Sequence, residues 1–311
     1  MSSGLGAGAQ VGYPEHLRQE VEAYLEQLSF AEEVEAAGLE EAMRYSLLAG
    51  GKRIRPVLVL ATARAVGLEH AEMLPLAGAI ELIHTYSLIH DDLPAMDDDE
   101  LRRGRPTCHR VYGEDVAILA GDALYAEAFR HLLTAQRAAP ERLLAAAAEL
   151  AHATGVNGMV GGQYLDIHRE GAGALAAADP SRALRKVHEL KTGRLIGASV
   201  SCVLLLAGVQ ERATIALRSF AAELGVLFQI VDDILDVTGT DAALGKPRGS
   251  DERRGRHTYV SEYGIERARA LAGESHQAAR AALVQAAREA PESAASAELE
   301  QITDFIYLRT S

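Results

Sequence analysis

Apolar residues recur along this chain every three or four positions, which is the spacing of helices and not the alternation of strands. The first helical segment is expected from about Pro14 to Phe30, and others are expected to end near Val66, Arg137, Gly155 and Gly208. The abundance of alanine, leucine and glutamate favours the same conformation. We therefore predict an all-α fold, a single-domain helical bundle.

The composition of a few stretches sets the limits of this domain. Residues 1–13 are rich in glycine and serine and are expected to be a disordered tail, whereas residues 14–311 show no internal repeat and no linker and form one predicted domain. Residues 239–257 are polar and glycine-rich, and a loop of that length in a compact domain is usually functional, so we expect a lid. Two closing helices are expected at about 258–290 and 293–309.

Charge and composition exclude several classes of function. The 311 residues carry 44 acidic and 31 basic side chains, and the net charge of −13 repels nucleic acid, so no nucleic-acid partner is expected. Cys108 and Cys202 lack metal-ligand spacing and are expected to be reduced thiols of a cytoplasmic protein. The stretch MSSGLGAGAQVGYPEHL has no signal-peptide pattern. The longest nearly apolar run, residues 196–209, is shorter than the ~20 residues that span a bilayer, so we expect a core helix and no membrane span.

Six acidic residues fall within positions 91–100, at the end of an apolar helical segment. Asp91 and Asp92 would lie at the negative pole of that helix, where a cation is stabilised and an anion is not. Pro94 stops or bends the helix, so the chain has to loop for Asp97 to rejoin Asp91. Magnesium binds through one or two carboxylates plus substrate phosphates, and this cluster suits it. The alternative is a solvated acidic loop.

A second acidic cluster lies in FQIVDDILD, residues 228–236. Gln229, Asp232, Asp233 and Asp236 share one helical face, and apolar residues occupy the other. Carboxylates at this spacing repel one another, so a buried helix that carries them requires a countercharge. We predict that the two clusters face each other across one metal site.

Basic residues that suit a phosphate accompany both clusters. The stretch GGKRIRP, residues 50–56, places Lys52, Arg53 and Arg55 at the start of a helix, where backbone N–H groups and the helix dipole favour an anion. A basic surface turn is the alternative. Lys191 lies in a run that becomes apolar, so its ammonium must reach solvent or meet an anion. The other cations expected in this pocket are Arg102, Arg103 and Lys246.

The remaining motifs exclude several types of reaction. The glycines of GMVGGQYLDI, residues 158–167, favour close helix packing over phosphate binding, and helical register brings Gln163 near Asp166. No Ser-His-Asp or Cys-His pairing suggests covalent catalysis, and the P-loop pattern GxxxxGK[ST] does not occur. The pattern therefore indicates metal-assisted chemistry on a polyphosphate.

Several motifs, in this order, resemble those of trans-isoprenyl diphosphate synthases, and most closely those of bacterial short-chain farnesyl diphosphate synthases. The resemblance covers about residues 14–309 and rests on GGKRIRP, SLIHDDLPAMDDDELRRGRPT, GMVGGQYLD, KTG, and FQIVDDILD followed by LGK. The DDxxxxD spacing of the first aspartate motif is similar to the bacterial type. The resemblance implies a helical bundle around a deep central cavity, usually in a homodimer.

The resemblance also implies a role for each matching residue. Magnesium, three ions in each active site, would be held by Asp91, Asp92, Asp97, Asp232, Asp233 and Asp236. Isopentenyl diphosphate would meet Lys52, Arg55, His84 and Arg103. The allylic diphosphate would meet Arg102, Lys191, Thr192, Gln229 and Lys246. The Lys191 carbonyl, Thr192 hydroxyl and Gln229 amide would face the carbocation that forms when the allylic diphosphate ionises.

Two residues bear on the length of the product. In the family a bulky residue five positions before the first aspartate closes the cavity, and here Tyr86 stands there, ~7.5 Å along a helix from Asp91. This implies a stop at farnesyl diphosphate, made from dimethylallyl or geranyl diphosphate. Ser87 is small and near the face of Asp91, which leaves geranylgeranyl diphosphate as the alternative product.

Rival functions are distinguished by the same motifs. A class I terpene cyclase usually carries an Asn/Ser/Glu metal triad where this chain has DDILD. A non-catalytic subunit that modulates another synthase would be expected to have lost aspartates or Lys191, and none is lost. A plain helical scaffold gives no reason for six carboxylates on two apolar helices.

Overall fold

The structure, a computed structural model, describes residues 12–168, 179–209, 211–239, 249, 255–289 and 297–309. The all-α prediction is confirmed in these ranges, where the only sheet is a hairpin of β1 (Leu101–Arg102) and β2 (Arg105–Pro106). The helices are α1 (Glu15–Glu26), α2 (Ala37–Leu47), α3 (Ile54–Ala65), α4 (Leu74–Asp91), α5 (Cys108–Tyr112), α6 (Glu114–Ala135), α7 (Pro140–Thr154), α8 (Met159–Ile167), α10 (Pro180–His188), α11 (Arg194–Ala207), α12 (Glu211–Thr238), α15 (Tyr259–Tyr263), α16 (Ile265–Glu289) and α17 (Ala297–Leu308). Short 3₁₀ turns are η1 (Val34–Ala36) and η2 (His70–Met73), and η4 (Glu189–Gly193) is a π-helix.

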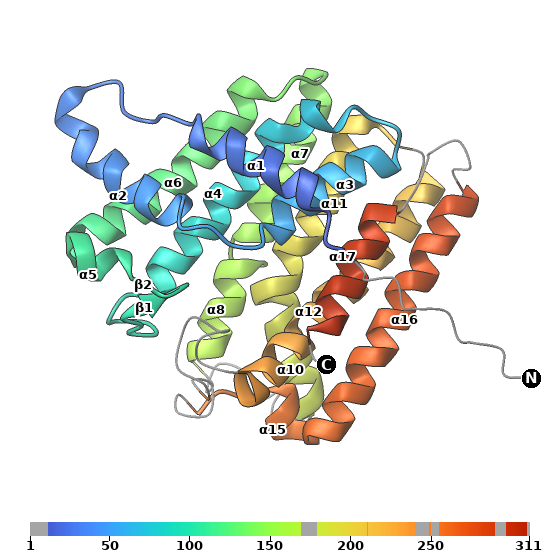
Figure 1. The fold of residues 1–311 in the computed structure, drawn as a ribbon. Coiled ribbons are helices and arrows are strands. Elements are labelled where there is room, and N and C mark those ends of the chain that lie inside the picture. Colours follow the sequence, from blue (N-terminus) through green and yellow to red (C-terminus); the bar gives the residue numbers. More distant parts are fainter. Residues whose placement is uncertain are drawn as a thin grey trace, which may run out of the picture.

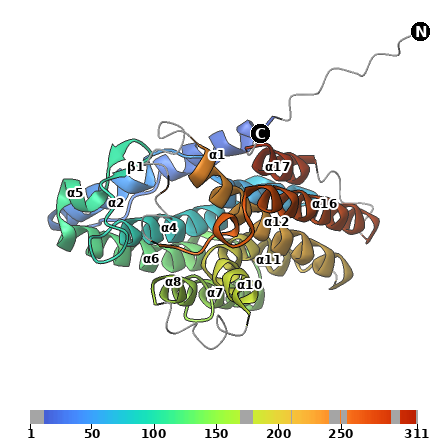
Figure 2. The same ribbon diagram turned by 90° about the horizontal axis from the view of Figure 1, so that it is seen from below.

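Helix α4 lies in the interior of the bundle (Figures 1 and 2). It packs against α3 and α11 and, most extensively, against α6, while α12 packs against α11 and α16. Leu76, Ile80, Leu82 and Ile83 are fully buried, and apolar residues surround the helix axis, as expected of a helix enclosed on all sides. This apolar helix therefore carries its acidic C-terminal end into the molecule.

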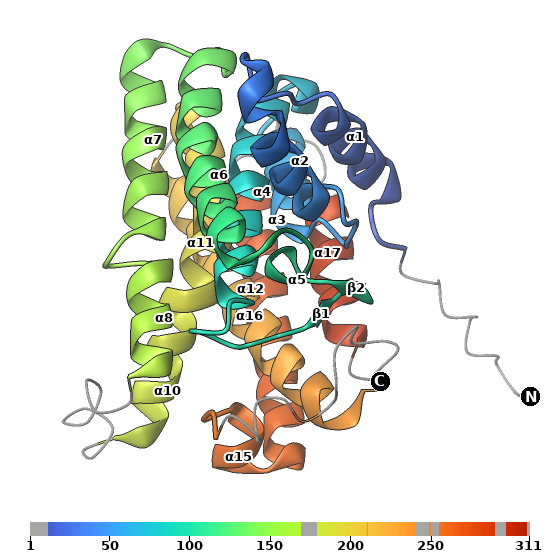
Figure 3. The same ribbon diagram turned by 90° about the vertical axis from the view of Figure 1, so that its left-hand side faces the viewer.

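One end of the bundle gathers the segments that carry polar motifs. Figure 3 shows α8, α10 and α15 at this end, with the β1–β2 hairpin beside them. The π-helix η4 joins α10 to α11, the helix that ends near Gly208 as predicted. A π turn contains one extra residue and is found mainly at functional sites, and here it holds the KTG motif.

Two short segments have contacts that the composition of the sequence did not indicate. Tyr13, which was assigned to the predicted tail, packs its ring against Phe305, with centroids 4.8 Å apart, and its hydroxyl donates to the Lys52 carbonyl at 2.7 Å. The segment after Pro106 contains the short helix α5, whose Cys108 is buried.

Two helical segments are long and apolar enough to cross a membrane by length and composition. They are Ser181–Ala207 and Thr214–Thr238, of which 61% and 50% respectively lie buried within the bundle. The second one also carries the acidic face of FQIVDDILD. The apolar composition of both helices is therefore accounted for by their position in the core of the protein.

Candidate active site

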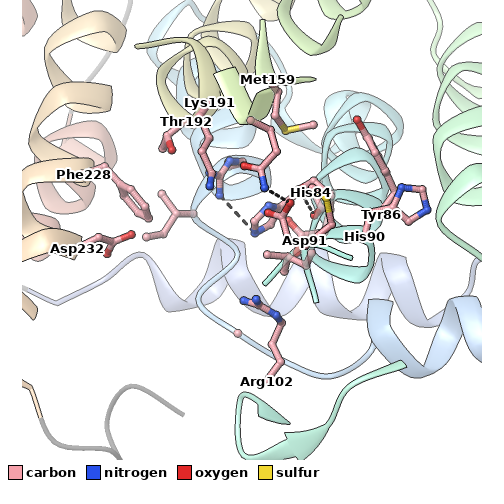
Figure 4. A pocket seen from close by; sticks show the side chains of 18 of the residues that line it. His84, Tyr86, His90, Asp91, Arg102, Met159, Lys191, Thr192, Phe228 and Asp232 are labelled. Carbon is pink, nitrogen blue, oxygen red and sulfur yellow. Dashed lines mark hydrogen bonds between the residues drawn. The ribbon is translucent and has the colours of Figure 1, made fainter. Parts of the chain in front are cut away.

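The two acidic clusters face one cavity. Asp91, at the end of α4, and Asp232, on α12, both line a space of about 750 Å³ (Figure 4). The other predicted site residues that line it are Lys52, Arg55, His84, Tyr86, Ser87, Arg102, Arg103, Lys191 and Thr192. Side chains from far apart in the sequence thus meet at one place, and its chemistry is carboxylate on two sides with cations between them.

The remaining predicted site residues that the structure describes lie outside the lining of this cavity. Asp92 contacts Arg102 and Gln229 contacts Thr192, both of which line the cavity, and Asp233 contacts Gln229. Asp97 rejoins the first cluster as the loop prediction requires, because its N–H donates to the Asp91 carbonyl at 2.9 Å. Asp236 is buried on α12. Lys246 lies outside the described residues.

Asp91 is a buried carboxylate that accepts a hydrogen bond from an amide. The Gln163 side-chain nitrogen, on α8, donates to it at 2.8 Å. Burial raises the pKa of Asp91 to about 6, and the nearby charge of Asp97 adds to the shift although Lys191 opposes it. The ionised form of Asp91 is therefore disfavoured here until more positive charge arrives.

Asp92, the next residue, already has a cation in contact. Arg102, on β1, donates through Nε to both carboxylate oxygens at 2.8 and 2.9 Å. Its Nη2 lies 2.6 Å from the same carboxylate. Burial raises the pKa of Asp92, and Arg102 counteracts part of this shift. The hairpin is thereby fixed against the end of α4.

A chain of hydrogen bonds orients the dipoles on the opposite wall. The Thr192 hydroxyl donates to the Gln229 carbonyl oxygen at 3.0 Å, and the Gln229 amide donates to Asp233 at 2.8 Å. Asp233 also accepts from the Tyr259 N–H at 2.7 Å. Because the Thr192 proton is committed to Gln229, the lone pairs of its oxygen are left for the cavity.

Lys191 meets an anion, which is one of the two alternatives that its position in an apolar run predicts. Its ammonium lies 2.6 Å from Asp166 of α8, and Asp166 also pairs with Arg256 at 3.5 Å. Burial alone would raise the pKa of Asp166, but Lys191 and Arg256 lower it below its ordinary value. Arg256 in turn pairs with Asp97. This row of alternating charges connects three segments around the cavity.

The basic side of the cavity is built around Arg55. Its guanidinium is 3.4 Å from the His84 Nε2 and lies over the ring of Phe228, 5.7 Å from the ring centroid. Burial and the charge of Arg55 lower the pKa of His84 well below its ordinary value, so His84 is neutral and accepts from Arg55. The Arg55 Nε is buried without a partner among the described residues.

Arg53 does not belong to this basic side, which corrects the interpretation of GGKRIRP as three phosphate-facing cations. It adopts the left-handed conformation (φ 51°), and its guanidinium turns into the core. It pairs with Glu81 at 2.5 Å and with Glu22 at 2.9 Å. A charge that two carboxylates already neutralise is not free for a ligand, so Lys52 and Arg55 remain as the cations of this motif.

Comparison with known proteins identifies the family. A family model described as polyprenyl synthetase matches residues 36–300. The chain belongs to the polyprenyl synthetase family. It is 47% identical over 255 residues to the farnesyl diphosphate synthase of Geobacillus stearothermophilus, covering 81% of this chain and 84% of the relative. It is 48% identical over 246 residues to the heterodimeric geranylgeranyl pyrophosphate synthase large subunit 1 of Arabidopsis thaliana, covering 78% of this chain and 66% of the relative.

A solved member of this fold family carries ligands. The geranyltransferase of Helicobacter pylori, complexed with magnesium and isoprenyl diphosphate, superposes with a TM-score of 0.79 at 31% identity. The match covers 98% of this chain and 99% of that chain. The polyprenyl synthetase fold is thus shared over nearly the whole length.

The donor set suits magnesium in the way the polyprenyl synthetase fold implies. Among the described residues, no three acidic, histidine or cysteine side chains converge closely enough to hold a metal ion by themselves. Magnesium needs only one or two carboxylates when phosphate oxygens supply other ligands. The buried carboxylate of Asp91, with its raised pKa, is such a donor, and Asp232 faces the same cavity.

Several residues of the site were not among the predicted site residues. Gln163 was placed near Asp166 by helical register, yet its contact with Asp91 depends on how α8 packs. Phe228 and Arg309 line the cavity, and Arg309 lies 3.6 Å from Asp232. Phe228 begins the motif FQIVDDILD, which was a usable signal, whereas nothing near the C-terminus marked Arg309.

Proposed function

We propose that this protein is a magnesium-dependent trans-prenyltransferase. It condenses isopentenyl diphosphate with dimethylallyl or geranyl diphosphate and gives farnesyl diphosphate. The observation that carries the proposal is the single 750 Å³ cavity lined by Asp91 on one side, Asp232 on the other and cations between them. The family membership supports the same reaction class.

The carboxylates hold the metal ions and through them the allylic diphosphate. This role falls to Asp91, Asp92, Asp97, Asp232, Asp233 and Asp236, with three ions in each site. Bound there, magnesium neutralises the diphosphate and stabilises the departing pyrophosphate. Arg102 and Lys191, with Lys246, add positive charge to the same group.

The second substrate binds on the basic side. Lys52, Arg55 and Arg103 face the cavity and attract the diphosphate of isopentenyl diphosphate. Neutral His84 holds Arg55 without competing for the anion. The ring of Phe228 lies under the guanidinium of Arg55 and covers the hydrocarbon chains of the substrates.

The reaction requires dipoles that stabilise a carbocation and a site that excludes water. It depends less on side chains that act as acids or bases. The C–O bond of the allylic diphosphate breaks, and its electron pair leaves with pyrophosphate. The double bond of isopentenyl diphosphate forms the new C–C bond, and pyrophosphate takes up the proton that is lost. The Thr192 oxygen, held by Gln229, and the Lys191 carbonyl on the π-helix are dipoles suited to stabilise the cation.

Tyr86 supports a fifteen-carbon product. Its ring lines the cavity and is otherwise buried, one and a half helical turns from Asp91. Geranylgeranyl diphosphate remains the second candidate product, because the neighbouring Ser87 is small and a relative named as a geranylgeranyl pyrophosphate synthase subunit is 48% identical. We also expect the protein to act as a homodimer in the cytoplasm.

One assay tests the proposal. The purified chain is incubated with labelled isopentenyl diphosphate and dimethylallyl, geranyl or farnesyl diphosphate, with and without magnesium, and the products are separated by length. Magnesium-dependent conversion of the first two primers to a fifteen-carbon product is expected. Conversion of farnesyl diphosphate alone to a hydrocarbon would identify a terpene cyclase instead, and no turnover by the single chain would identify a non-catalytic subunit.

A further inference from the structure

Three aromatic rings follow one another from the cavity outward, between α4 and α6. Tyr86 lines the cavity, and its ring meets that of Tyr125 at nearly a right angle (79°), with centroids 5.0 Å apart. Tyr125 meets Phe129, one turn farther along α6, with centroids 5.3 Å apart. Tyr125 and Phe129 are not part of the cavity wall. A second ring therefore stands directly behind the first.

Tyr125 is held by contacts that do not depend on Tyr86. Its hydroxyl lies 3.3 Å from the hydroxyl oxygen of Thr154, on α7. Thr154 is buried and donates its own proton to the Leu150 carbonyl at 2.9 Å, so Tyr125 is the donor. Together with the packing against Phe129, this bond fixes the ring from behind. Loss of Tyr86 would leave Tyr125 in place.

Tyr86 itself is held on a second side. The ring of His90, one turn along α4, meets it at 81° with centroids 5.7 Å apart (Figure 4). The His90 Nε2 lies 3.1 Å from the Ile118 carbonyl, and its ring fills the space that Gly121 leaves open on α6. Because Tyr86 packs between the rings of His90 and Tyr125, its displacement by a growing hydrocarbon chain would cost free energy.

We propose that Tyr125 is a second residue that limits the length of the product, acting behind Tyr86. Tyr86→Ala removes about seven non-hydrogen atoms and leaves a cavity with room for about one five-carbon unit. Its far boundary is then the ring of Tyr125. This inference rests on the proposed function, because the chain whose growth is limited is the product of the condensation.

Growth into such a cavity is expected to be favourable. Burying hydrocarbon is favourable in proportion to the apolar area removed from water, so an added isoprenoid unit is expected to fill an apolar space that opens. We therefore expect the main product to lengthen by one five-carbon unit for each aromatic ring that is removed. A single open channel would instead give a broad range of lengths once Tyr86 is gone.

The test uses the full chain and compares product lengths among four proteins. Tyr86→Ala is expected to lengthen the main product by one five-carbon unit, and Tyr86→Ala combined with Tyr125→Ala by two or more. Tyr125→Ala alone should leave the main product unchanged, since Tyr86 still closes the cavity. Tyr125→Leu replaces Tyr125→Ala if the smaller side chain prevents folding.

A matched control separates the ring from its hydroxyl. Tyr125→Phe in the Tyr86→Ala background loses the bond to Thr154 but keeps the ring, so its products should match those of Tyr86→Ala. The inference is overturned if the double alanine variant makes the same products as Tyr86→Ala. Product ratios are compared at equal conversion of isopentenyl diphosphate, so that a smaller amount of folded enzyme cannot mimic the shift. Failure of the wild-type chain to incorporate label would contradict the proposed function itself.

Discussion

A carboxylate buried at the C-terminal end of a helix is disfavoured twice, by lost hydration and by the negative pole of the helix dipole. Asp91 is in this position at the end of α4, and its pKa is raised to about 6. Asp92, the next residue, is also buried but has a guanidinium in contact. The two neighbours therefore differ in their partners: Asp92 already has the Arg102 guanidinium in contact, whereas Asp91 keeps a charge that a ligand can neutralise.

This difference predicts that Asp91→Asn stabilises the metal-free protein at pH 8. The folded pKa of about 6 lies above the ordinary value of 3.8, so the ionised carboxylate costs up to ~3 kcal/mol above pH 6. The penalty develops as the pH rises from about 4 to 6 and is absent below that window. Urea unfolding at pH 8 and pH 4 should show the gain at the first pH only.

Asp92→Asn is the matched variant and should behave in the opposite way. Arg102 would lose the carboxylate that it holds through three contacts, at a cost of about 1–3 kcal/mol at pH 8. If Asp91→Asn also destabilises the protein at pH 8, then the amide of Gln163 already offsets the burial of Asp91, and the assignment of Asp91 as an uncompensated charge is wrong.

Between elements, the closest approach at the site is that of α8 to the π-helix η4. A Cβ placed on Gly162 would lie 2.2 Å from the Lys191 nitrogen and 2.6 Å from its Cα. Only a residue without a side chain allows these backbones to touch. The glycines of GMVGGQYLDI therefore serve packing, and that packing sets the position of Lys191 and Thr192.

Gly162→Ala should therefore damage activity more than stability. Overpacking costs ~1–3 kcal/mol, and a displacement of the KTG segment by ~1 Å is expected to lower kcat/KM about 100-fold. Gly197→Ala is the control, because Gly197 lies in α11 with no atom within 4 Å of an added Cβ. It should be neutral or stabilising by up to ~1 kcal/mol. Equal turnover by the two variants would show that the contact does not position η4.

The buried pair of Arg53 and Glu81 joins α3 to α4. Glu81→Ala would leave the Arg53 guanidinium, whose side chain is fully buried, with Glu22 as its remaining carboxylate partner. Breaking such a pair costs ~3 kcal/mol in the free energy of unfolding. Glu266→Ala breaks an exposed pair with Arg269 and should change it by less than about 0.5 kcal/mol. Similar losses in denaturant unfolding would mean that Arg53 finds another partner.

At the scale of the whole molecule, the sequence predicted the fold and the meeting of the two acidic clusters, because carboxylates on apolar helices require a shared countercharge. It also predicted that Lys191 would reach solvent or meet an anion, and the structure shows the second, with Asp166 as the anion. Both Arg53 and Arg55 border the cavity, and spacing could not tell that the Arg53 guanidinium, on a residue in the left-handed conformation, pairs with two carboxylates instead of facing a ligand. The positions of Gln163 and Arg309 depend on packing between distant segments, which no local pattern encodes.

The cavity lies between two walls, and we expect both of them to be needed to bind the diphosphate. Helix α11 packs against both α4 and α12, which bring Asp91 and Asp232 to opposite walls. Because no three metal-binding side chains converge among the described residues, an ion needs phosphate oxygens to complete its ligands. Metal and pyrophosphate should therefore bind together and tie the two walls to each other.

Magnesium and inorganic pyrophosphate are accordingly expected to stabilise the protein only in combination. At concentrations near 100 times the dissociation constant, joint binding adds ~2.7 kcal/mol, which raises the Tm by about 5 °C, whereas each compound alone should change it by less than about 1 °C. Thermal unfolding with each ligand and with both measures this. Asp91→Asn and Asp232→Asn should both abolish the joint effect, while Asp122→Asn, an exposed acid on α6, should keep it. A full shift with magnesium alone would mean that the carboxylates form a complete ion site without phosphate.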